Sequence, residues 1–158
     1  MLDENKSIES IRAFRKDPGI VAVYQETQLN PYLNGTVDMA IFIDGSGYEY
    51  WTYPETGKLI QAAPAAHVPP RSYAVAPEAR LSVAELRLMA IETVSGQVPG
   101  FVSRRPNLHP LEDNRNREVY FFRWDDSSVH VPESELPPFV QIGLRADGAL
   151  VSFTNTIN

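Results

Sequence analysis

Three histidines are the side chains best suited to bind a transition metal in this chain of 158 residues. His67, His109 and His130 could hold zinc only if they converged with carboxylates such as Glu112 or Glu133. Their spacing matches no recognised zinc-ligand pattern, and each lies in a segment that we predict to be a linker or a loop. We therefore favour solvated histidines over a metal site, and we predict no metal and no cofactor.

Two pairs of adjacent carboxylates could in principle divide the roles of general acid and general base. Glu112 stands beside Asp113, and Asp125 stands beside Asp126. Such a division requires surroundings that push the two pKa values apart, and polar loops do not bury a carboxyl group. The serines lack a nucleophile elbow and a histidine partner, and the chain has no glycine-rich phosphate loop. We predict solvated turns at both pairs and a protein that is not an enzyme.

The segment 44–49 reads Asp-Gly-Ser-Gly-Tyr-Glu and contains some of the ligand types of a calcium loop. It lacks the twelve-residue spacing of such loops, and it lies between two strand patterns. An Asp-Gly pair is also common at the centre of a tight hairpin. A hairpin turn is therefore the favoured interpretation.

Aromatic residues concentrated in two predicted strands are better candidates for binding. Tyr120, Phe122 and Trp124 alternate along segment 119–124 and so share one face of a strand, while the opposite face is also apolar. One face must pack on a helix, and the other needs cover from a second sheet or from an external partner. Mutual burial of the two sheets or their helices within the protein is the favoured alternative. The same question applies to a second cluster, formed by Tyr48, Tyr50, Trp51 and Tyr53.

Four arginines in the second half of the chain could collect an anionic group or an acidic peptide. Arg104 and Arg105 precede a polar loop, and Arg115 and Arg117 lie across it. Arginines at a loop edge usually stay solvated, which is the favoured alternative. The candidate binding residues are the two aromatic clusters and the first arginine pair, namely Tyr48, Tyr50, Trp51, Tyr53, Tyr120, Phe122, Trp124, Arg104 and Arg105.

The composition excludes several classes of protein. Hydrophobic residues make up 43% of the chain and charged residues 22%, which is typical of an ordered globular protein. The net charge of -6 argues against partners such as nucleic acid and anionic membranes. No cysteine is present, so the chain has neither disulfides nor thiolate metal sites. No run approaches the roughly 20 apolar residues of a membrane span, so we predict a soluble chain whose membrane attachment would need a segment absent from it.

The first half of the chain predicts one helix and four strands. Ile8, Ile11 and Phe14 recur at helical spacing after Ser7, a candidate N-cap, and the Asp-Pro-Gly sequence at 17–19 stops the helix. Strand-length runs then alternate with turn residues such as those at 34–35, 44–45 and 54–57. The predicted strands are residues 20–24, 37–43, 48–53 and 59–62.

The second half repeats this order after a segment rich in proline and alanine, residues 62–80, which reads as a linker. Ser82 and Glu85 form a capping box, and Leu81 and Leu86 stand at the positions of a hydrophobic staple, so a helix begins here. The predicted elements are this helix, ending at Gly96, and strands at residues 101–104, 119–124, 139–144 and 149–153.

The matching order of elements predicts a duplication. The fold class is α+β, with two similar units that each pack one helix on a roughly four-stranded antiparallel sheet. The units are residues 1–61 and 81–158, and residues 62–80 link them.

The terminal hairpin of each predicted unit resembles that of the PepSY-like domain. The resemblance is carried by segment 48–60, Tyr-Glu-Tyr-Trp-Thr-Tyr-Pro-Glu-Thr-Gly-Lys-Leu-Ile, and more loosely by segment 140–151, Val-Gln-Ile-Gly-Leu-Arg-Ala-Asp-Gly-Ala-Leu-Val. It covers most of the chain outside the linker and makes the protein similar to a tandem of such domains. The resemblance implies an extracytoplasmic bacterial module, often attached to membrane proteins or peptidases and proposed to bind or restrain them, without cofactor or catalytic residues.

The leading hypothesis is a non-catalytic binding or regulatory module that acts on a protein or peptide partner through an aromatic sheet face or a free strand edge. The alternative is a receptor for a small molecule or peptide, held in a cleft between sheet and helix or between the two units. An enzymatic reading would need turnover that depends on Glu112 or Asp113.

Overall fold

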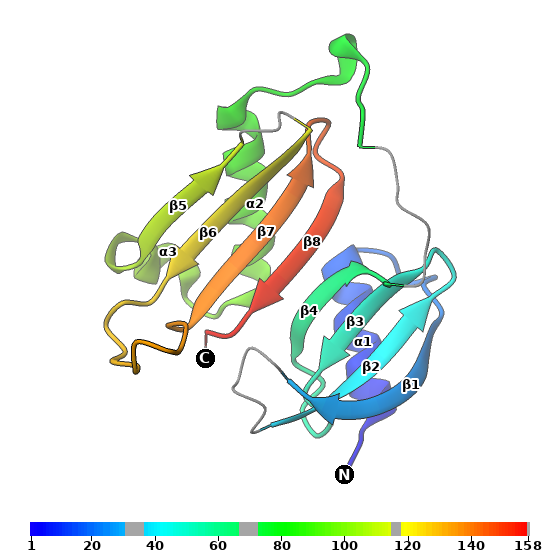
Figure 1. The fold of residues 1–158 in the computed structure, drawn as a ribbon. Helices are drawn as coiled ribbons and strands as arrows, with labels where there is room; N and C mark the ends of the chain where they lie inside the picture. The colour runs from blue at the N-terminus through cyan, green and yellow to red at the C-terminus, as the bar shows by residue number, and fades with distance from the viewer. Residues whose placement is uncertain (31–36, 67–72, 115–117, 158) are drawn as a thin grey trace. The chain divides into compact units, whose positions relative to one another are not determined.

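The computed structural model describes residues 1–30, 37–66, 73–114 and 118–157. The chain divides into two compact units, Met1–Val68 and Pro69–Asn158, and the division lies within the predicted linker. Each unit contains α-helix and an antiparallel sheet, so the α+β class is confirmed (Figure 1).

Unit 1 begins with helix α1, Glu4–Arg15. Its N-cap is Asp3, whose side chain accepts a hydrogen bond from the backbone N–H of Lys6, so the predicted cap at Ser7 is wrong. Ser7 instead lies inside the helix, fully buried, where its hydroxyl forms a hydrogen bond of 2.7 Å with that of Thr52. The helix ends at Lys16, which adopts the left-handed conformation.

Four strands follow as an antiparallel meander in the order β1-β2-β3-β4. The strand β1 is longer than the prediction at 20–24, and β4 extends into the predicted linker. The predicted turn at 34–35 lies outside the described residues. The strands are β1 Ala22–Leu29, β2 Asp38–Asp44, β3 Tyr48–Thr52 and β4 Leu59–Pro64.

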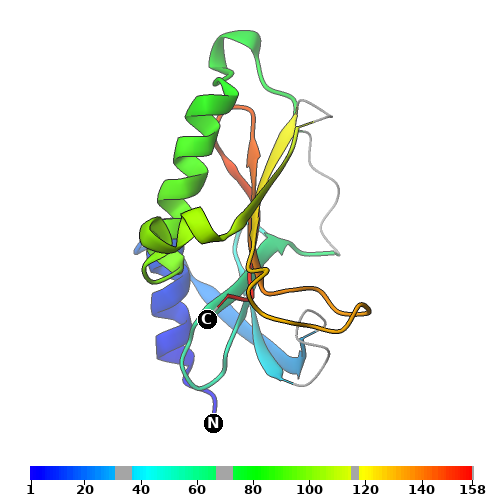
Figure 2. The same ribbon diagram turned by 90° about the vertical axis from the view of Figure 1, so that its left-hand side faces the viewer.

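Helix α1 covers one face of this sheet (Figure 2). Ile11 and Phe14 are the apolar side chains that it buries. They share the core of unit 1 with Phe42, Tyr50 and Ile60, all of which are fully buried.

Unit 2 begins with a short 3-10 turn, η2 (Pro77–Ala79), and helix α2, Val83–Gln97. Both hydrogen bonds of the predicted capping box between Ser82 and Glu85 are present. The predicted end at Gly96 is wrong, because the helix continues to Gln97 and Gly96 does not have a positive φ.

The predicted strand at 101–104 is also wrong. These residues form a short helix, α3 (Phe101–Arg104), followed by the 3-10 turn η3 (Arg105–Asn107). The first strand of unit 2 is instead β5, His109–Asp113, within a segment that we predicted to be a polar loop. Unit 2 therefore has a second, short helix beside α2.

The remaining strands of unit 2 agree with the predictions to within two residues, and together with β5 they form a meander in the order β5-β6-β7-β8. They are β6 Val119–Asp125, β7 Phe139–Arg145 and β8 Leu150–Asn155. Helix α2 packs on β6 and β7 and buries Leu86, Ala90 and Val94. It covers one face of the sheet (Figure 2).

A glycine with a positive φ stands in the last hairpin turn of each unit and lies against the helix of that unit. A Cβ atom at Gly57 (φ 73°) would lie 2.5 Å from the backbone carbon of Lys6, at the start of α1. A Cβ atom at Gly148 (φ 93°) would lie 2.5 Å from the terminal carbon of Met89, on α2. Both turns favour glycine because of the positive φ, and Gly57 is required also because a side chain there would meet the backbone of α1.

Candidate functional site

The aromatic residues predicted for binding in unit 2 belong to its core. Tyr120, Phe122 and Trp124 are 8%, 1% and 4% exposed, on the face of β6 that packs on α2. The ring of Trp124 meets that of Phe101 edge to face, with centroids 5.1 Å apart. These side chains hold helices on the sheet and form no open face.

The predicted aromatic cluster of unit 1 divides between the two faces of its sheet. Tyr48 and Tyr50 are buried on the side of α1, whereas Trp51 and Tyr53 are half-buried. Trp51 points to the opposite face, where its indole N–H donates to the carboxylate of Glu49 at 2.6 Å. Of the seven aromatic candidates, Trp51 and Tyr53 are therefore the ones that remain accessible.

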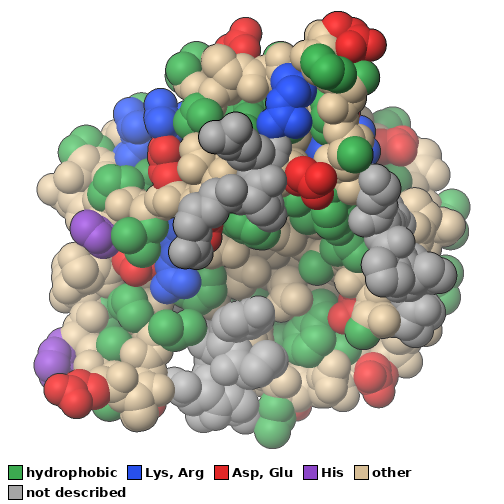
Figure 3. Space-filling model, turned by 45° about the horizontal axis from the view of Figure 1, so that its top comes forward, with side chains coloured by type: hydrophobic (Ala, Val, Ile, Leu, Met, Phe, Trp, Pro, Cys, Tyr) green, Lys and Arg blue, Asp and Glu red, His purple; other side chains and the backbone are tan. Residues whose placement is uncertain are grey.

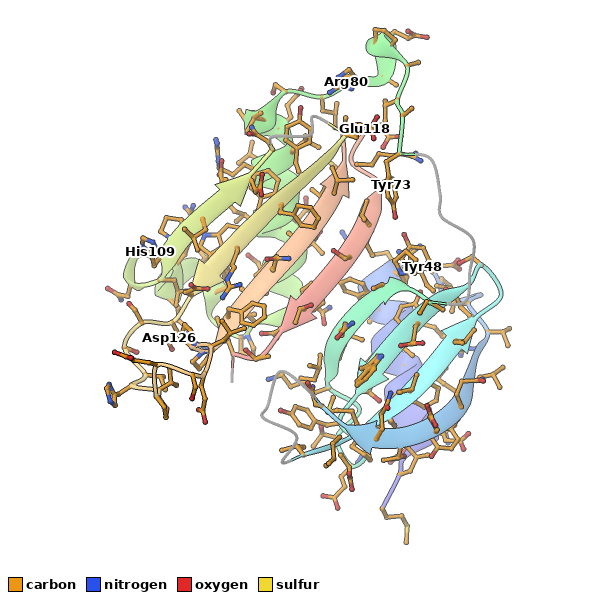
Figure 4. The ribbon with its side chains drawn as sticks, in the orientation of Figure 1. Tyr48, Tyr73, Arg80, His109, Glu118 and Asp126 are labelled. Atoms are coloured by element: carbon orange, nitrogen blue, oxygen red, sulfur yellow. The ribbon has the colours of Figure 1, made fainter. Side chains whose placement is uncertain are left out.

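Asp44 organises the turn between β2 and β3. Its Oδ1 accepts hydrogen bonds from the backbone and hydroxyl of Ser46 and from the backbone N–H of Tyr48, and its Oδ2 accepts one of 2.7 Å from the Tyr50 hydroxyl. The favoured hairpin turn is thus confirmed (Figure 4 labels Tyr48 at the start of β3). A calcium ion would have to displace these four donors.

The same network shifts two pKa values. Burial raises the pKa of Asp44, but the hydrogen bonds from Tyr50, Ser46 and Tyr48 outweigh burial and hold this pKa below its usual range. Burial, together with the hydrogen bond to Asp44, raises the pKa of Tyr50. Asp44 is therefore an ionised structural acceptor and Tyr50 a neutral donor. Arg15 lies over the ring of Tyr48, 4.7 Å from its centroid.

Two of the four arginines predicted to collect an anionic group lie within the described residues, Arg104 and Arg105. Arg104 lies 3.9 Å from a carboxylate oxygen of Asp126, and Arg105 is exposed. Arg115 and Arg117 lie outside the described residues. On the face shown in Figure 3, acidic and basic side chains are interspersed among the coloured residues.

The prediction of solvated turns at the carboxylate pairs is wrong for Glu112 and Asp113, which lie in the strand β5. Glu112 and Asp113 are successive residues of β5, so their side chains project to opposite faces of the sheet. Glu112 accepts hydrogen bonds from Arg87 on α2, one of them 2.9 Å long, and these bonds lower its pKa. Asp125 accepts a hydrogen bond from Arg123, and Asp126 accepts two from Ser128.

The histidines do not form a metal site within the part of the chain that the structure describes, where no group of three or more potential ligands converges. His109 is exposed at the start of β5, and His130 is exposed beyond β6 (Figure 4 labels His109 and Asp126). His67 lies outside the described residues. In the same described part, no helix has the length and apolar character needed to span a bilayer.

The surface feature that sequence reasoning did not locate is the edge of the unit 1 sheet, formed by β1. This strand ends the order of strands, and among the described residues only β2 pairs with it. Six of its eight residues are exposed, and Val23 and Leu29 are large apolar side chains with 57% of their surface accessible. Val21, just before the strand, is 67% exposed. An open strand edge with apolar side chains is a template for pairing with another chain.

A bulge interrupts the pairing of β1 with β2. Tyr24 pairs with Phe42 and Glu26 with Ile41, so Gln25 is the extra residue. The side-chain amide of Gln25 donates to the carbonyl of Val23 at 3.0 Å and to that of Tyr24 at 3.4 Å. The Gln25 side chain thereby occupies backbone carbonyl groups near the centre of β1.

An open hollow of about 810 Å³ lies beside the first half of β1. Its walls come from the loop after α1, from the start of β1 and from the turn between β2 and β3. Apolar lining is supplied by Ile20, Val21, Val23 and Ile43, and polar groups of Arg15, Asp17 and Ser46 border it. The hollow could accept an apolar side chain of a partner that lies along β1.

An edge strand of the unit 2 sheet, β5, is less suited to pairing. It has five residues, and Pro110 within it has no N–H to donate. Glu112, on the same strand, is bound by Arg87. Short length, proline and charge are the usual means by which a protein blunts a sheet edge.

Comparisons of the chain with family models, with curated proteins and with solved structures gave no significant match.

Proposed function

We propose that this chain is a non-catalytic binding module that holds a protein or peptide partner by adding a strand of the partner to β1. The observation that carries this proposal is that the aromatic sheet faces are mostly buried while the edge strand β1 is exposed. The predicted aromatic sheet faces are largely used for the core, whereas β1 is a long edge strand with exposed apolar residues. Main-chain hydrogen bonds at such an edge give affinity, and the side chains on each face give specificity.

A peptide library tests this function. Random nine-residue peptides are selected for binding to the full chain, and the best binders are measured against the variants Val23→Lys and Leu111→Lys. Val23 lies on β1 and Leu111 on β5, and their side chains are similarly exposed. We expect Val23→Lys to weaken binding about tenfold, because it places a charge where the partner would bury apolar surface, and Leu111→Lys to leave binding unchanged. Binders that respond only to Leu111→Lys contradict the proposal.

A second candidate function is a receptor for a small apolar ligand, and the hollow beside β1 favours it. A ligand that binds only the folded protein raises the melting temperature by mass action. Thermal-shift screening with small molecules that lack backbone amides separates the two functions. A shift that is lost in Ile43→Lys but is caused by no peptide supports the receptor and contradicts strand addition.

We also propose that the two units are copies of one PepSY-like unit. Support comes from the shared order of one main helix and four meander strands, and from the helix-contacting glycines Gly57 and Gly148. An experimental structure in which α1 with β1–β4 fails to superpose on α2 with β5–β8 contradicts the duplication.

The PepSY-like resemblance further supports an extracytoplasmic location, in the cell envelope or secreted, and a peptidase or membrane protein as the natural partner. Fractionation of cells that express the protein from its native locus tests the location. Recovery in the cytosol alone contradicts it.

A further inference from the structure

We infer that the partner of β1 is an extended peptide that runs antiparallel to it, with basic residues in its N-terminal half and apolar residues in its C-terminal half. This inference rests on the proposed strand addition and specifies the chemistry of the partner. It follows from the distribution of charge and apolar surface along β1.

The strands of unit 1 carry carboxylates and no cation. None of the residues of β1, β2, β3 and β4 is lysine or arginine. The basic residues of the described part of this unit lie instead on α1, at its C-cap and in the turn between β3 and β4, at Lys6, Arg12, Arg15, Lys16 and Lys58. A strand added to β1 therefore meets an acidic sheet, and complementary charge on the partner must be positive.

The acidic groups nearest to the edge lie along the second half of β1, where a second hollow that Thr27 and Asp38 line also contains one basic side chain, Lys58. Glu26 is exposed on β1 itself. Asp38 is exposed at the start of β2, where it pairs with Leu29, the last residue of β1. Asp44, by contrast, is occupied by its four internal hydrogen bonds and is not available to a partner. Lysine or arginine of the partner is thus best placed beside residues 26–29.

The first half of β1 offers apolar surface. Val21 and Val23 are exposed and line the hollow together with the half-buried Ile43. The charged residues at this end have opposite signs, because Arg15 and Asp17 both border the hollow. Apolar side chains of the partner are therefore best placed here, where they cover exposed valine surface.

The acidic end and the apolar end of β1 together set the direction in which the partner strand runs. An antiparallel strand beside β1 begins opposite Leu29 and ends opposite Ala22, the last and first residues of β1. Antiparallel pairs are slightly more stable per residue than parallel pairs, and β1 already pairs in this way with β2. Basic residues then come first in the partner and apolar residues second.

Three fluorescent nine-residue peptides test this inference by anisotropy with the full chain. The first has lysine at alternate positions of its N-terminal half, valine at alternate positions of its C-terminal half and threonine elsewhere. The second has the same sequence in reverse, and the third has glutamate in place of lysine. We expect the first to bind about threefold more tightly than the second and about tenfold more tightly than the third, with the difference shrinking in high salt.

Two variants with the same change in net charge locate the effect. Glu26→Gln on β1 should weaken binding of the lysine peptide about threefold, as expected for one exposed ion pair. Glu9→Gln, on the exposed face of α1, should leave binding unchanged. Equal losses of affinity in the two variants would show that only the net charge of the protein matters, and would overturn the inference.

The remaining outcomes separate this inference from the proposed function. Equal binding of the lysine and glutamate peptides, with both weakened by Val23→Lys, overturns the partner chemistry and leaves strand addition intact. Equal binding of the first and reversed peptides overturns the direction alone. If no designed or selected peptide is weakened by Val23→Lys, strand addition and the inference both fail.

Discussion

The two units share a framework and differ at one edge strand each, β1 in unit 1 and β5 in unit 2. In both, a helix lies on an antiparallel meander, and a left-handed glycine in the last hairpin touches that helix. The edge strand β1, however, is long and carries exposed valine and leucine, whereas β5 is short and contains proline. A few edge residues can therefore leave the same framework open or closed to a partner.

The shared framework can be broken at its turn glycines, where the largest effect is expected. Gly57→Ala forces an alanine into the left-handed region and against the backbone of α1, so we expect a loss of about 4 kcal/mol. In Gly148→Ala the contact is the flexible end of Met89, so the loss should be about 2 kcal/mol, mainly from backbone conformation. Urea unfolding measures both variants, and a larger loss for Gly148→Ala contradicts the packing described.

The hairpin behind β1 depends on Asp44. Asp44→Ala removes four hydrogen bonds and leaves the buried Tyr50 hydroxyl without its acceptor, so we expect a loss of about 3 kcal/mol. Unfolding followed by Trp51 fluorescence, in a Trp124→Phe background, reports on unit 1. Asp38→Ala, at an exposed carboxylate, is the matched control and should change stability little. Similar losses in both variants would contradict the structural role of Asp44.

The contribution of Asp44 to the free energy of unfolding should fall as the pH is lowered. The folded-state pKa of Asp44 is depressed, so its contribution to stability is fully present above its unfolded pKa of about 3.9 and is lost as pH falls through the lower folded pKa. The stability difference between wild type and Asp44→Ala should therefore be constant near neutral pH and shrink below about pH 4.

Helix α2 illustrates what the sequence could predict. Ser82 and Glu85 form a capping box that depends on local residues alone, and both of its hydrogen bonds are present. Ser7 was misread as a cap because a serine before an apolar stripe looks the same whether it caps the helix or lies buried inside it. The short α3 (Phe101–Arg104) was misread as a strand because four residues are too few to distinguish the two periodicities.

The candidate site was harder to predict than the core. Alternation of apolar and polar residues marks strands that bury one face, but residues 25–28 of β1, Gln-Glu-Thr-Gln, are all exposed and carry no such pattern. The aromatic residues of β6 stand out in the sequence, but their side chains are buried in the core. The exposed Val21 and Val23 were visible in the sequence, but only the strand order shows that they lie at an edge.

The closed edge of unit 2 can be tested through the ion pair between Arg87 and Glu112. Both side chains are more than a third exposed, so Arg87→Ala should cost only about 0.5 kcal/mol. The hydrogen bond from Arg87 depresses the folded-state pKa of Glu112, so this contribution is present above the unfolded pKa of about 4.3 and disappears as pH falls further. Unfolding at pH 7 and pH 3 measures it, and an undiminished difference at pH 3 contradicts the assignment.

The smallest expected effect concerns the bulge in β1. Gln25→Ala removes the side-chain amide that caps the carbonyls of Val23 and Tyr24, so peptide binding to β1 should tighten about twofold. Gln28→Ala, at an exposed position of the same strand, is the control and should leave the affinity unchanged. Weaker binding in Gln25→Ala would indicate that this side chain contacts the partner instead.

Hydrogen exchange of the full chain, with and without a saturating library-selected peptide, tests whether a partner strand adds to β1. We expect the backbone amides of residues 22–29 to gain protection while those of residues 109–113 do not change, and we expect the gain to vanish in Val23→Lys. Protection that appears on β5, or on neither edge while the peptide is bound, would contradict partner binding at β1.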